Sequence, residues 1–387
     1  MSKCIAVLGA TGSVGTQALD VAHKNGYAVD FISANKNVVS AESLARRFKV
    51  KYVAMSDESA AKDLRSRLAD TDITVLHGES GVIEGIGRSG AATVVNSIIG
   101  EAGLMPTLAT IDAGKRLALA NKESLVIAGD IVMSRARENN VEIIPVDSEH
   151  SAIFQSLKSG RNKEIKKLIL TASGGPFYGR SYEQLSSVTL ADTLAHPTWK
   201  MGKKITVDSA TLMNKGFEII EAVHLFGVAP EKIQVVVHRQ SILHSAVEYI
   251  DNSIIGELSV PDMRMCVQYA VDYPDRCEAV CDELDLIGLG TMTFAEPDYQ
   301  AFPLLSLAKS AISRGGAMPC VVNAADEIAV AAFLDGRIGF TDIYDVVIGT
   351  FDKMDKAKSY TALADIISAD EEARAIARAH VKNINKI

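Results

Sequence analysis

The sequence of 387 residues lacks several features that mark whole classes of protein. Its 40 lysines and arginines are outnumbered by 48 acidic residues, and the net charge of −8 argues against general binding to nucleic-acid phosphates. No apolar run approaches the roughly 20 residues that a membrane-spanning helix needs. The first residues read MSKCIAVLGATG, without the apolar core of a secretion signal. We therefore expect a cytoplasmic protein that binds neither nucleic acid nor membrane.

Cysteine and tryptophan are scarce as well. Cys277 and Cys281 are spaced like half of a metal site, but no second Cys or His pair completes the set. We therefore interpret the five cysteines as reduced thiols of an intracellular protein. The single tryptophan, Trp199, lies in a basic stretch that also carries glycine, which is an unusual setting for so large an apolar side chain.

The first part of the chain alternates short apolar segments with helical patterns. Such alternation predicts a mostly parallel sheet with helices on both faces. We expect a Rossmann-like, doubly wound domain over residues 1–146, with the strands CIAVLG (4–9), VDFISA (29–34), YVAM (52–55), ITVLHG (73–78), TVVNSI (93–98), RLALA (116–120) and VEIIPV (141–146).

The remaining chain changes character twice. Residues 147–272 contain longer and less regularly spaced apolar segments, which predict a central α+β domain with an open mixed sheet. Residues 273–300 have the composition of a linker, and residues 301–387 show the spacing of a C-terminal helical bundle. The strands expected in the central domain are IKKLILTAS (165–173), KITVDS (204–209), IQVVVHRQSILHSAVEYI (233–250) and SIIGELSV (253–260).

Three glycines follow the first expected strand at the spacing Gly9-x-x-Gly12-x-x-Gly15. Between a strand and a helix, this spacing allows a tight turn and lets the backbone approach a pyrophosphate. The second strand ends at Ser33-Ala34-Asn35-Lys36-Asn37, without the acid that commonly binds the ribose of NAD. Because Lys36 suits a 2′-phosphate, the sequence predicts an NADP site.

Acidic residues follow the last strand of this domain. In an extended chain, Asp147 and Glu149 would lie on one face and could bind one Mg²⁺ or Mn²⁺ ion, although Asp147 could instead cap a helix. Glu218 offers a third carboxylate, whereas Glu221 could be a solvated helix charge. Lys122 could bind a substrate oxygen, or its segment could be the start of a helix that Asn121 caps. The sequence leaves these alternatives open.

Hydroxyl, amide and ammonium groups gather in the central domain, where Ser173, Ser209, Asn214 and Lys215 have the chemistry of a phosphate site. The loop at residues 196–204 contains Trp199 among cations. We interpret it as a lid that closes on a ligand, the alternative being a tryptophan packed at a domain seam. His238 and His244 lie six apart on an expected strand, so we interpret them as interior hydrogen-bonding residues on one face.

Taken together, these motifs resemble those of the 1-deoxy-D-xylulose 5-phosphate reductoisomerase family. The resemblance covers nearly the whole chain, and its most specific part is HPTWKMGKKITVDSATLMNKGFEIIEA (196–222). The other matching segments are GATGSVG (9–15), ALANKESLV (118–126), PVDSEHSAIFQ (145–155), LTASGGPF (170–177) and SVPDMR (259–264).

The resemblance implies a homodimeric enzyme of the non-mevalonate route to isoprenoid precursors, and a target of fosmidomycin. Such an enzyme converts 1-deoxy-D-xylulose 5-phosphate and NADPH to 2-C-methyl-D-erythritol 4-phosphate. It uses a divalent metal, either Mg²⁺ or Mn²⁺, with Co²⁺ as a further option. The carbon skeleton rearranges by a retro-aldol/aldol or an α-ketol route, and the sequence does not choose between them.

The resemblance also implies roles for individual residues. The implied metal ligands are Asp147, Glu149 and Glu218, and these three are also implied to be catalytic, together with Lys122 and His196. The implied substrate contacts are Lys122, Ser148, Glu149, Ser173, His196, Trp199, Ser209, Asn214, Lys215 and Glu218. The implied NADPH contacts are Thr11, Gly12, Ser13, Val14, Asn35, Lys36, Asn37, Asn121, Glu123 and Gly202, with Met263 near the nicotinamide.

The chain departs from the family pattern at two places. It reads His238-Arg239-Gln240-Ser241 where the family usually has His-Pro-Gln-Ser, and it lacks a proline that the family often has near Cys266. Two rival classes share parts of the pattern. A semialdehyde-type dehydrogenase also begins with GATGxVG but needs an activated cysteine nucleophile. A non-catalytic NADP-binding or sensing protein on the same fold would need no set of convergent carboxylates.

Overall fold

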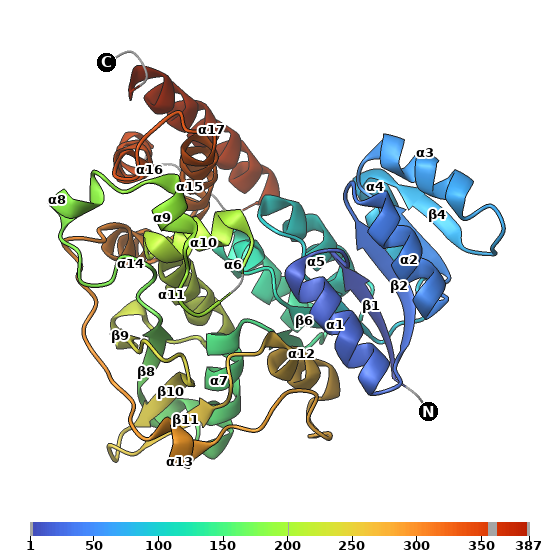
Figure 1. The fold of residues 1–387 in the computed structure, drawn as a ribbon, viewed down its shortest axis with the longest axis horizontal. Helices are drawn as coiled ribbons and strands as arrows, with labels where there is room; N and C mark the ends of the chain where they lie inside the picture. Colours follow the sequence, from blue (N-terminus) through green and yellow to red (C-terminus); the bar gives the residue numbers. More distant parts are fainter. Residues whose placement is uncertain (1–2, 200, 355–361, 385–387) are drawn as a thin grey trace. The chain divides into compact units, whose positions relative to one another are not determined.

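Figure 1 shows the computed structural model of the chain, which describes residues 3–199, 201–354 and 362–384. The chain divides into two compact units. The first comprises residues 1–124, 132–154 and 262–283, and the second comprises residues 125–131, 155–261 and 284–387. Each unit has a sheet of its own.

The first unit is built on a parallel sheet in the order β4-β3-β2-β1-β5-β6-β7. The chain starts in the middle of the sheet, fills one side with β2 to β4 and then fills the other with β5 to β7. This order confirms the predicted Rossmann-like, doubly wound fold, in which ligands bind where the strand order reverses. The strands are β1 (Cys4–Leu8), β2 (Ala28–Ala34), β3 (Tyr52–Met55), β4 (Thr74–His77), β5 (Thr93–Asn96), β6 (Arg116–Leu119) and β7 (Ile143–Pro145).

Helices cover both faces of this sheet, so its strands are apolar on both sides. Alternate residues of β1 enter different cores, with Ile5 and Val7 in one and Ala6 and Leu8 in the other. The first core also takes side chains from α1, α2, α3 and α12, whereas the second takes side chains from α4. The helices are α1 (Ser13–Lys24), α2 (Val38–Phe48), α3 (Glu58–Arg67), α4 (Gly78–Arg88), α5 (Leu104–Asp112), α6 (Glu123–Glu138), α7 (Ser148–Ser156) and α12 (Met263–Asp272).

The second unit contains an open mixed sheet in the order β11-β10-β8-β9, as predicted. Strand β8 runs parallel to β9 and antiparallel to β10, which in turn pairs antiparallel with β11. The strands are β8 (Ile165–Ala172), β9 (Ile233–Val237), β10 (Leu243–Tyr249) and β11 (Ile254–Leu258).

The strand predicted at KITVDS is wrong, because residues 203–210 form helix α10 (Lys203–Ala210). The apolar Ile205 and Val207 alternate as in a strand, but so short a run does not separate strand from helix. Local interactions favour the helix: Thr206 Oγ1 donates to the carbonyl of Gly202 at 2.8 Å. Lys204 and Asp208, one turn apart, form an ion pair at 2.7 Å.

The single strand predicted over residues 233–250 is also wrong, because a turn separates β9 from β10. His238 follows β9 directly, and its backbone N–H donates to the carbonyl of Ala172 at 2.7 Å. The chain then bends through Ser241, whose φ is +52°. His238 and His244 therefore lie on different segments rather than on one face of one strand.

Helices make up most of the rest of the second unit, which confirms the helical C-terminal region. None of the helices in the described ranges combines the length and the apolar character of a membrane span. The helices are α8 (Tyr182–Leu185), α9 (Leu190–Leu194), α10, α11 (Met213–Phe226), α13 (Leu286–Leu289), α14 (Leu304–Arg314), α15 (Met318–Leu334), α16 (Asp342–Lys353) and α17 (Leu363–Ile384).

The compact units do not follow the predicted domain boundaries residue by residue. Helix α12 belongs to the first unit, because Val267, Ala270 and Val271 lie in the same hydrophobic core as side chains of β1 and α1. The break between residues 283 and 284 falls inside the predicted linker, residues 273–300. The division into a nucleotide-binding, a catalytic and a C-terminal domain concerns function, and it stays a prediction.

The glycine turn after β1 generates a stability prediction. A Cβ atom on Gly15 would lie 2.2 Å from the carbonyl oxygen of Gly9, so Gly15→Ala should lower the free energy of unfolding by about 1–3 kcal/mol. Gly87 on α4 has open space around it, so Gly87→Ala should raise that free energy by about 0.5–1 kcal/mol. Urea unfolding of the two variants measures both changes. Equal effects would contradict the close packing of the turn.

Candidate functional site

The first unit places the glycine motif at the end of the central strand β1. Gly9 has a φ of +75°, and a Cβ there would lie 2.7 Å from the carbonyl oxygen of Ser97. Gly12 precedes α1, and no side chain caps this helix start. The turn therefore depends on glycine, and the first backbone N–H groups of α1 lie where dinucleotide folds bind a pyrophosphate.

The other predicted cofactor residues lie at the ends of strands and the starts of helices. Asn35, Lys36 and Asn37 are exposed after β2, and the Nζ of Lys36 lies 3.8 Å from Asp57. Asn37 also caps α2, since its side chain accepts from the N–H of Ser40. Thr11, Val14 and Met263 are half-buried, Ser13 is exposed, and Gly202 precedes α10 in the second unit.

Asn121 lies two residues before helix α6 and bonds to its first turn. Its Oδ1 accepts from the backbone N–H of Ser124 at 2.9 Å, and its amide donates to the carbonyls of Ile98 and Gly100. The same amide donates to Glu123 at 3.1 Å. Asn121 thus caps the helix, as one of the two interpretations held, and its contact with a cofactor stays a prediction.

Lys122 is buried beside a carboxylate. Its Nζ lies 2.6 Å from Oδ2 of Asp147, and the two side chains are 7% and 11% exposed. The pair brings the ends of β6 and β7 together, as expected for neighbouring parallel strands. A helix start alone does not account for Lys122, because its ammonium group pairs with Asp147, a predicted metal ligand.

The segment Asp147-Ser148-Glu149-His150 is not extended, so that part of the sequence argument is wrong. Strand β7 ends at Pro145 and α7 begins at Ser148. Asp147 precedes the helix: its Oδ1 accepts from the N–H of Glu149 at 3.3 Å, and its carbonyl accepts from the N–H of Ser151. The helix start is favoured over an extended chain because an acid at this position accepts hydrogen bonds from the N–H groups of the first turn. Ser148 donates to the carboxylate of Glu149.

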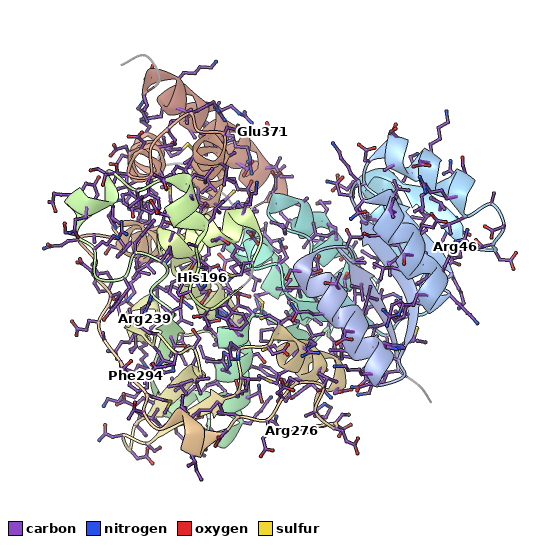
Figure 2. The ribbon with its side chains drawn as sticks, in the orientation of Figure 1. Arg46, His196, Arg239, Arg276, Phe294 and Glu371 are labelled. Carbon is purple, nitrogen blue, oxygen red and sulfur yellow. The ribbon has the colours of Figure 1, made fainter. Side chains whose placement is uncertain are left out.

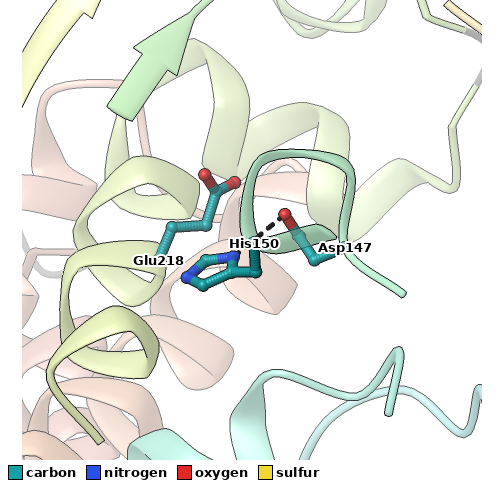
Figure 3. A group of neighbouring side chains, drawn as sticks. All are labelled: Asp147, His150 and Glu218. Atoms are coloured by element: carbon teal, nitrogen blue, oxygen red, sulfur yellow. Dashed lines mark hydrogen bonds and ion pairs between the residues drawn. The ribbon is translucent and has the colours of Figure 1, made fainter. Parts of the chain in front are cut away.

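His150 is a site residue that the sequence analysis missed. It is fully buried, and its Nδ1 lies 3.2 Å from Oδ1 of Asp147. Figure 3 draws this interaction as a dashed line and also draws Glu218 of the second unit. The spacing of three residues was the available signal, because it places His150 on the helix turn that Asp147 caps.

In the second unit, His196 joins two of the predicted phosphate-site serines. Its Nε2 lies 3.1 Å from Oγ of Ser173, after β8, and 3.1 Å from Oγ of Ser209, on α10. Its Nδ1 accepts from the backbone N–H groups of Thr198 and Trp199. Since Nδ1 acts as an acceptor, the ring proton lies on Nε2 and points to the serines.

The environment of His196 keeps its ring neutral. Burial, together with the positive charge of Arg239, lowers the pKa of His196 from 6.5 to about 4. Figure 2 labels both residues in the second unit. At neutral pH, His196 can therefore donate one hydrogen bond from Nε2 but contributes no charge.

Helix α11 carries the remaining polar residues predicted for the site. Glu218 is 1% exposed, and its carboxylate accepts from the amide of Asn214 and pairs with the ammonium of Lys215. These three residues are within one turn of each other. Glu221 is also 1% exposed, so the interpretation that it is a solvated helix charge is wrong.

The predicted lid, residues 196–204, differs from expectation in two ways. A loose lid leaves its tryptophan without a ring to pack on, but the ring centroids of Trp199 and His244 lie 6.3 Å apart. We counted Lys204 among its cations, but Lys204 belongs to α10 and pairs with Asp208 and Asp326. Lys200 lies outside the described residues.

His238 has the interior role that the sequence predicted. It is fully buried, its Nδ1 donates to the carbonyl of Thr293, and its Nε2 accepts from two backbone N–H groups. The departures at Arg239 and Cys266 lie outside strands, in the turn after β9 and on α12.

Comparison with known proteins identifies the family. Sequence models described as 1-deoxy-D-xylulose 5-phosphate reductoisomerase, its C-terminal domain and the DXP reductoisomerase C-terminal domain match residues 5–129, 143–226 and 258–376. The 1-deoxy-D-xylulose 5-phosphate reductoisomerase of Acetivibrio thermocellus is 50% identical over 382 residues, covering 99% of this chain and 100% of that protein. The chain belongs to the 1-deoxy-D-xylulose 5-phosphate reductoisomerase family.

Solved structures agree with this membership. The reductoisomerase from Zymomonas mobilis in complex with NADPH is 42% identical, with a TM-score of 0.92, over 99% of this chain and 100% of that chain. A reductoisomerase in complex with NADPH, fosmidomycin and magnesium is 39% identical, with a TM-score of 0.92, over 98% of both chains. As a reductoisomerase family member, the chain is an oxidoreductase and isomerase, which sets aside the semialdehyde-type dehydrogenase.

The neutral state of His196 generates a prediction. The ring should titrate with a pKa of about 4, whereas an unfolded histidine titrates near 6.5. Between these values the folded chain binds fewer protons than the unfolded chain, so stability is lost as the pH falls through this window. An NMR titration of the ring nitrogens measures the pKa. His196→Gln should remove this part of the pH dependence, and a pKa near 6.5 would contradict the burial argument.

Proposed function

We propose that this chain converts 1-deoxy-D-xylulose 5-phosphate to 2-C-methyl-D-erythritol 4-phosphate, using NADPH and a divalent metal, for the synthesis of isoprenoid precursors. The single observation that carries the proposal is the family match along nearly the whole chain at 50% identity. The site residues are consistent with it. Solved relatives hold NADPH, magnesium and the inhibitor fosmidomycin, so this chain is also a proposed fosmidomycin target.

The substrate phosphate is proposed to bind in the second unit at Ser173, Ser209, Asn214 and Lys215. The two hydroxyls each lie 3.1 Å from one imidazole nitrogen, so the segment after β8 and helix α10 meet at His196. Lys215 supplies a buried positive charge for the anion. Because His196 is neutral, it supplies a hydrogen bond there without attracting a second anion.

The metal is proposed to bind Asp147, Glu149 and Glu218. The donor chemistry fits, since carboxylate oxygens suit Mg²⁺ and Mn²⁺. The hydrogen bond between His150 Nδ1 and Asp147 Oδ1 would orient Asp147 as a ligand. When bound, such an ion polarises the substrate's oxygens and stabilises developing negative charge. Lys122 lies beside Asp147 and is proposed to hold a substrate oxygen, and Ser148 is proposed to contact the substrate as well.

NADPH is proposed to bind the glycine turn and the residues after β2. The turn at Gly9 and the start of α1 at Gly12 fit a pyrophosphate, because glycine permits the tight turn and no side chain caps the first N–H groups of α1. Lys36 is 76% exposed and available to a 2′-phosphate, although Asp57 competes for it at 3.8 Å. The cofactor supplies the hydride for the reduction. The remaining contacts are proposed to be Thr11, Ser13, Val14, Asn35, Asn37, Asn121, Glu123, Gly202 and Met263.

Residues 196–204 are proposed to cover the substrate. The backbone N–H groups of Thr198 and Trp199 donate to Nδ1 of His196. A ligand that contacts His196 would therefore lie beside the first residues of this segment. Trp199 is half-buried and can exchange its contact with His244 for a substrate. Excluding water in this way would strengthen the electrostatic interactions of the site.

Turnover separates this proposal from a non-catalytic NADP-binding protein. NADPH oxidation should require both 1-deoxy-D-xylulose 5-phosphate and Mg²⁺ or Mn²⁺. Glu218→Gln should lower kcat at least about a hundredfold, because it removes a charged ligand, while the Kd for NADPH changes less than about twofold. The rate of NADPH oxidation measures kcat, and a fluorescence titration measures the Kd for NADPH.

A matched glutamate provides the control. Glu371 on α17 is exposed, so Glu371→Gln should leave kcat unchanged. If the wild-type chain binds NADPH but never oxidises it with substrate and metal, the sensing alternative is right. If Glu218→Gln retains full turnover, the metal assignment is wrong.

A homodimer is proposed on the edge strand of the second unit. Strand β11 ends the sheet, and Ile254, Ile255 and Leu258 on it are 56%, 38% and 38% exposed. An exposed apolar edge is a template for another strand, and a second copy of the chain would cover it.

A cytoplasmic location is also proposed. The phosphorylated substrate and NADPH are metabolites of the cell interior, which supports this location.

Sedimentation velocity tests the dimer. The mass of the wild-type protein should be near twice 41.4 kDa. The double variant Ile254→Lys and Ile255→Lys should have the mass of the monomer, because buried charges oppose the pairing of two β11 strands. Ile367→Lys on α17, where the isoleucine is 41% exposed, should remain dimeric. A dimer that survives the β11 changes would exclude this edge.

A further inference from the structure

Arg239 contacts the backbone of the segment that carries Ser173. Its Nη1 donates to the carbonyl of Ser173 at 3.0 Å and to the carbonyl of Gly175 at 2.7 Å. A guanidinium nitrogen of this kind carries two N–H bonds, one for each carbonyl. The charge makes both bonds stronger than ordinary backbone hydrogen bonds.

The contacted segment, residues 173–175, has a backbone that needs such support. Gly174 and Gly175 are both left-handed, with φ of +78° and +63°. Two such glycines in a row are flexible on their own. Their surroundings are also tight, because a Cβ on Gly175 would lie 2.7 Å from the carbonyl oxygen of Ser209. The conformation places the N–H of Gly175 on the Ser173 hydroxyl at 3.2 Å.

Arg239 is itself held from two sides. The preceding residue, His238, is fully buried, stacks on Phe294 with centroids 4.9 Å apart, and bonds to three backbone groups. The guanidinium lies over the ring of Tyr178, 5.1 Å from its centroid. Arg239 therefore connects a fixed turn to the glycine segment rather than lying loose on the surface.

The charge of Arg239 acts on the same place. It is one of the two causes that keep His196 neutral, so its field reaches the imidazole that contacts Ser173 and Ser209. Figure 2 labels Arg239 and His196. A positive charge here disfavours an imidazolium and favours an anion beside it.

We propose that Arg239 is a positioning residue for the substrate's phosphate group: it fixes the Ser173–Gly175 backbone through two carbonyls and adds positive potential without touching the phosphate. This inference rests on the proposed function, in which Ser173 binds the phosphate. It assigns a role to a side chain outside the implied set of site residues.

Steady-state kinetics of the holoenzyme test the inference. Arg239→Gln should raise the KM for 1-deoxy-D-xylulose 5-phosphate about tenfold, equivalent to ~1.4 kcal/mol of binding. The kcat should fall less than about threefold and the KM for NADPH should not change, as expected for lost ground-state binding. Arg239→Lys should bring the KM within about threefold of wild type, because one ammonium can donate to both carbonyls and retains the charge. A general disturbance of folding would not be rescued in this way.

Two further variants distinguish the possible failures. Arg180→Gln removes an exposed arginine that lies five residues after this segment and has no contact with its carbonyls among the described bonds, so it should leave the KM unchanged. Ser173→Ala should raise the KM if the proposed phosphate site is right. If Ser173→Ala raises it and Arg239→Gln does not, the positioning role is overturned. If neither changes it, the proposed site itself is wrong. If Arg239→Lys resembles Arg239→Gln, the carbonyl and charge argument fails.

Discussion

The pairing of buried carboxylates with lysines is the constraint on which both units of this protein depend. A carboxylate removed from water is costly unless a charge or several donors compensate it. Asp147 has Lys122 in the first unit, and Glu218 has Lys215 in the second. Such pairs keep negative charges inside the fold at positions from which they can also bind a cation. In the proposed site the same lysines lie beside the anionic substrate, so one arrangement would serve folding and chemistry.

The sequence predicts the parallel sheet of the first unit but not that α12 joins it. The strands are apolar on both faces, and the glycines after β1 are informative because they lie between a strand and a helix. Prediction failed where local and tertiary preferences compete. Residues 204–209 alternate like a strand, yet Lys204 finds Asp208 one helical turn away. The segment 233–250 is apolar throughout, and only the turn around Ser241 separates its two strands.

For the candidate site, the sequence predicts residue types but not their geometry. Carboxylates, hydroxyls and ammonium groups were assigned from their chemistry, and contacts such as Lys122 with Asp147 join neighbouring strands. At Asp147 the spacing of the acids is compatible with both a helix start and an extended chain, so it does not decide between them. Trp199 against His244 was beyond prediction, because these residues meet only through tertiary structure. Arg239 departs from a family pattern, and only its contacts with the carbonyls of Ser173 and Gly175 indicate the proposed positioning role.

The shared nitrogen of His196 has one more consequence. Its single Nε2 proton faces two serine oxygens, so both hydroxyls sit at the positive end of the same N–H bond and neither can donate back to it. The hydroxyl hydrogens must therefore turn away from the ring. The protein thus excludes one orientation of each O–H group before any ligand arrives, and the hydroxyl hydrogens point to the side from which an incoming oxyanion can accept them.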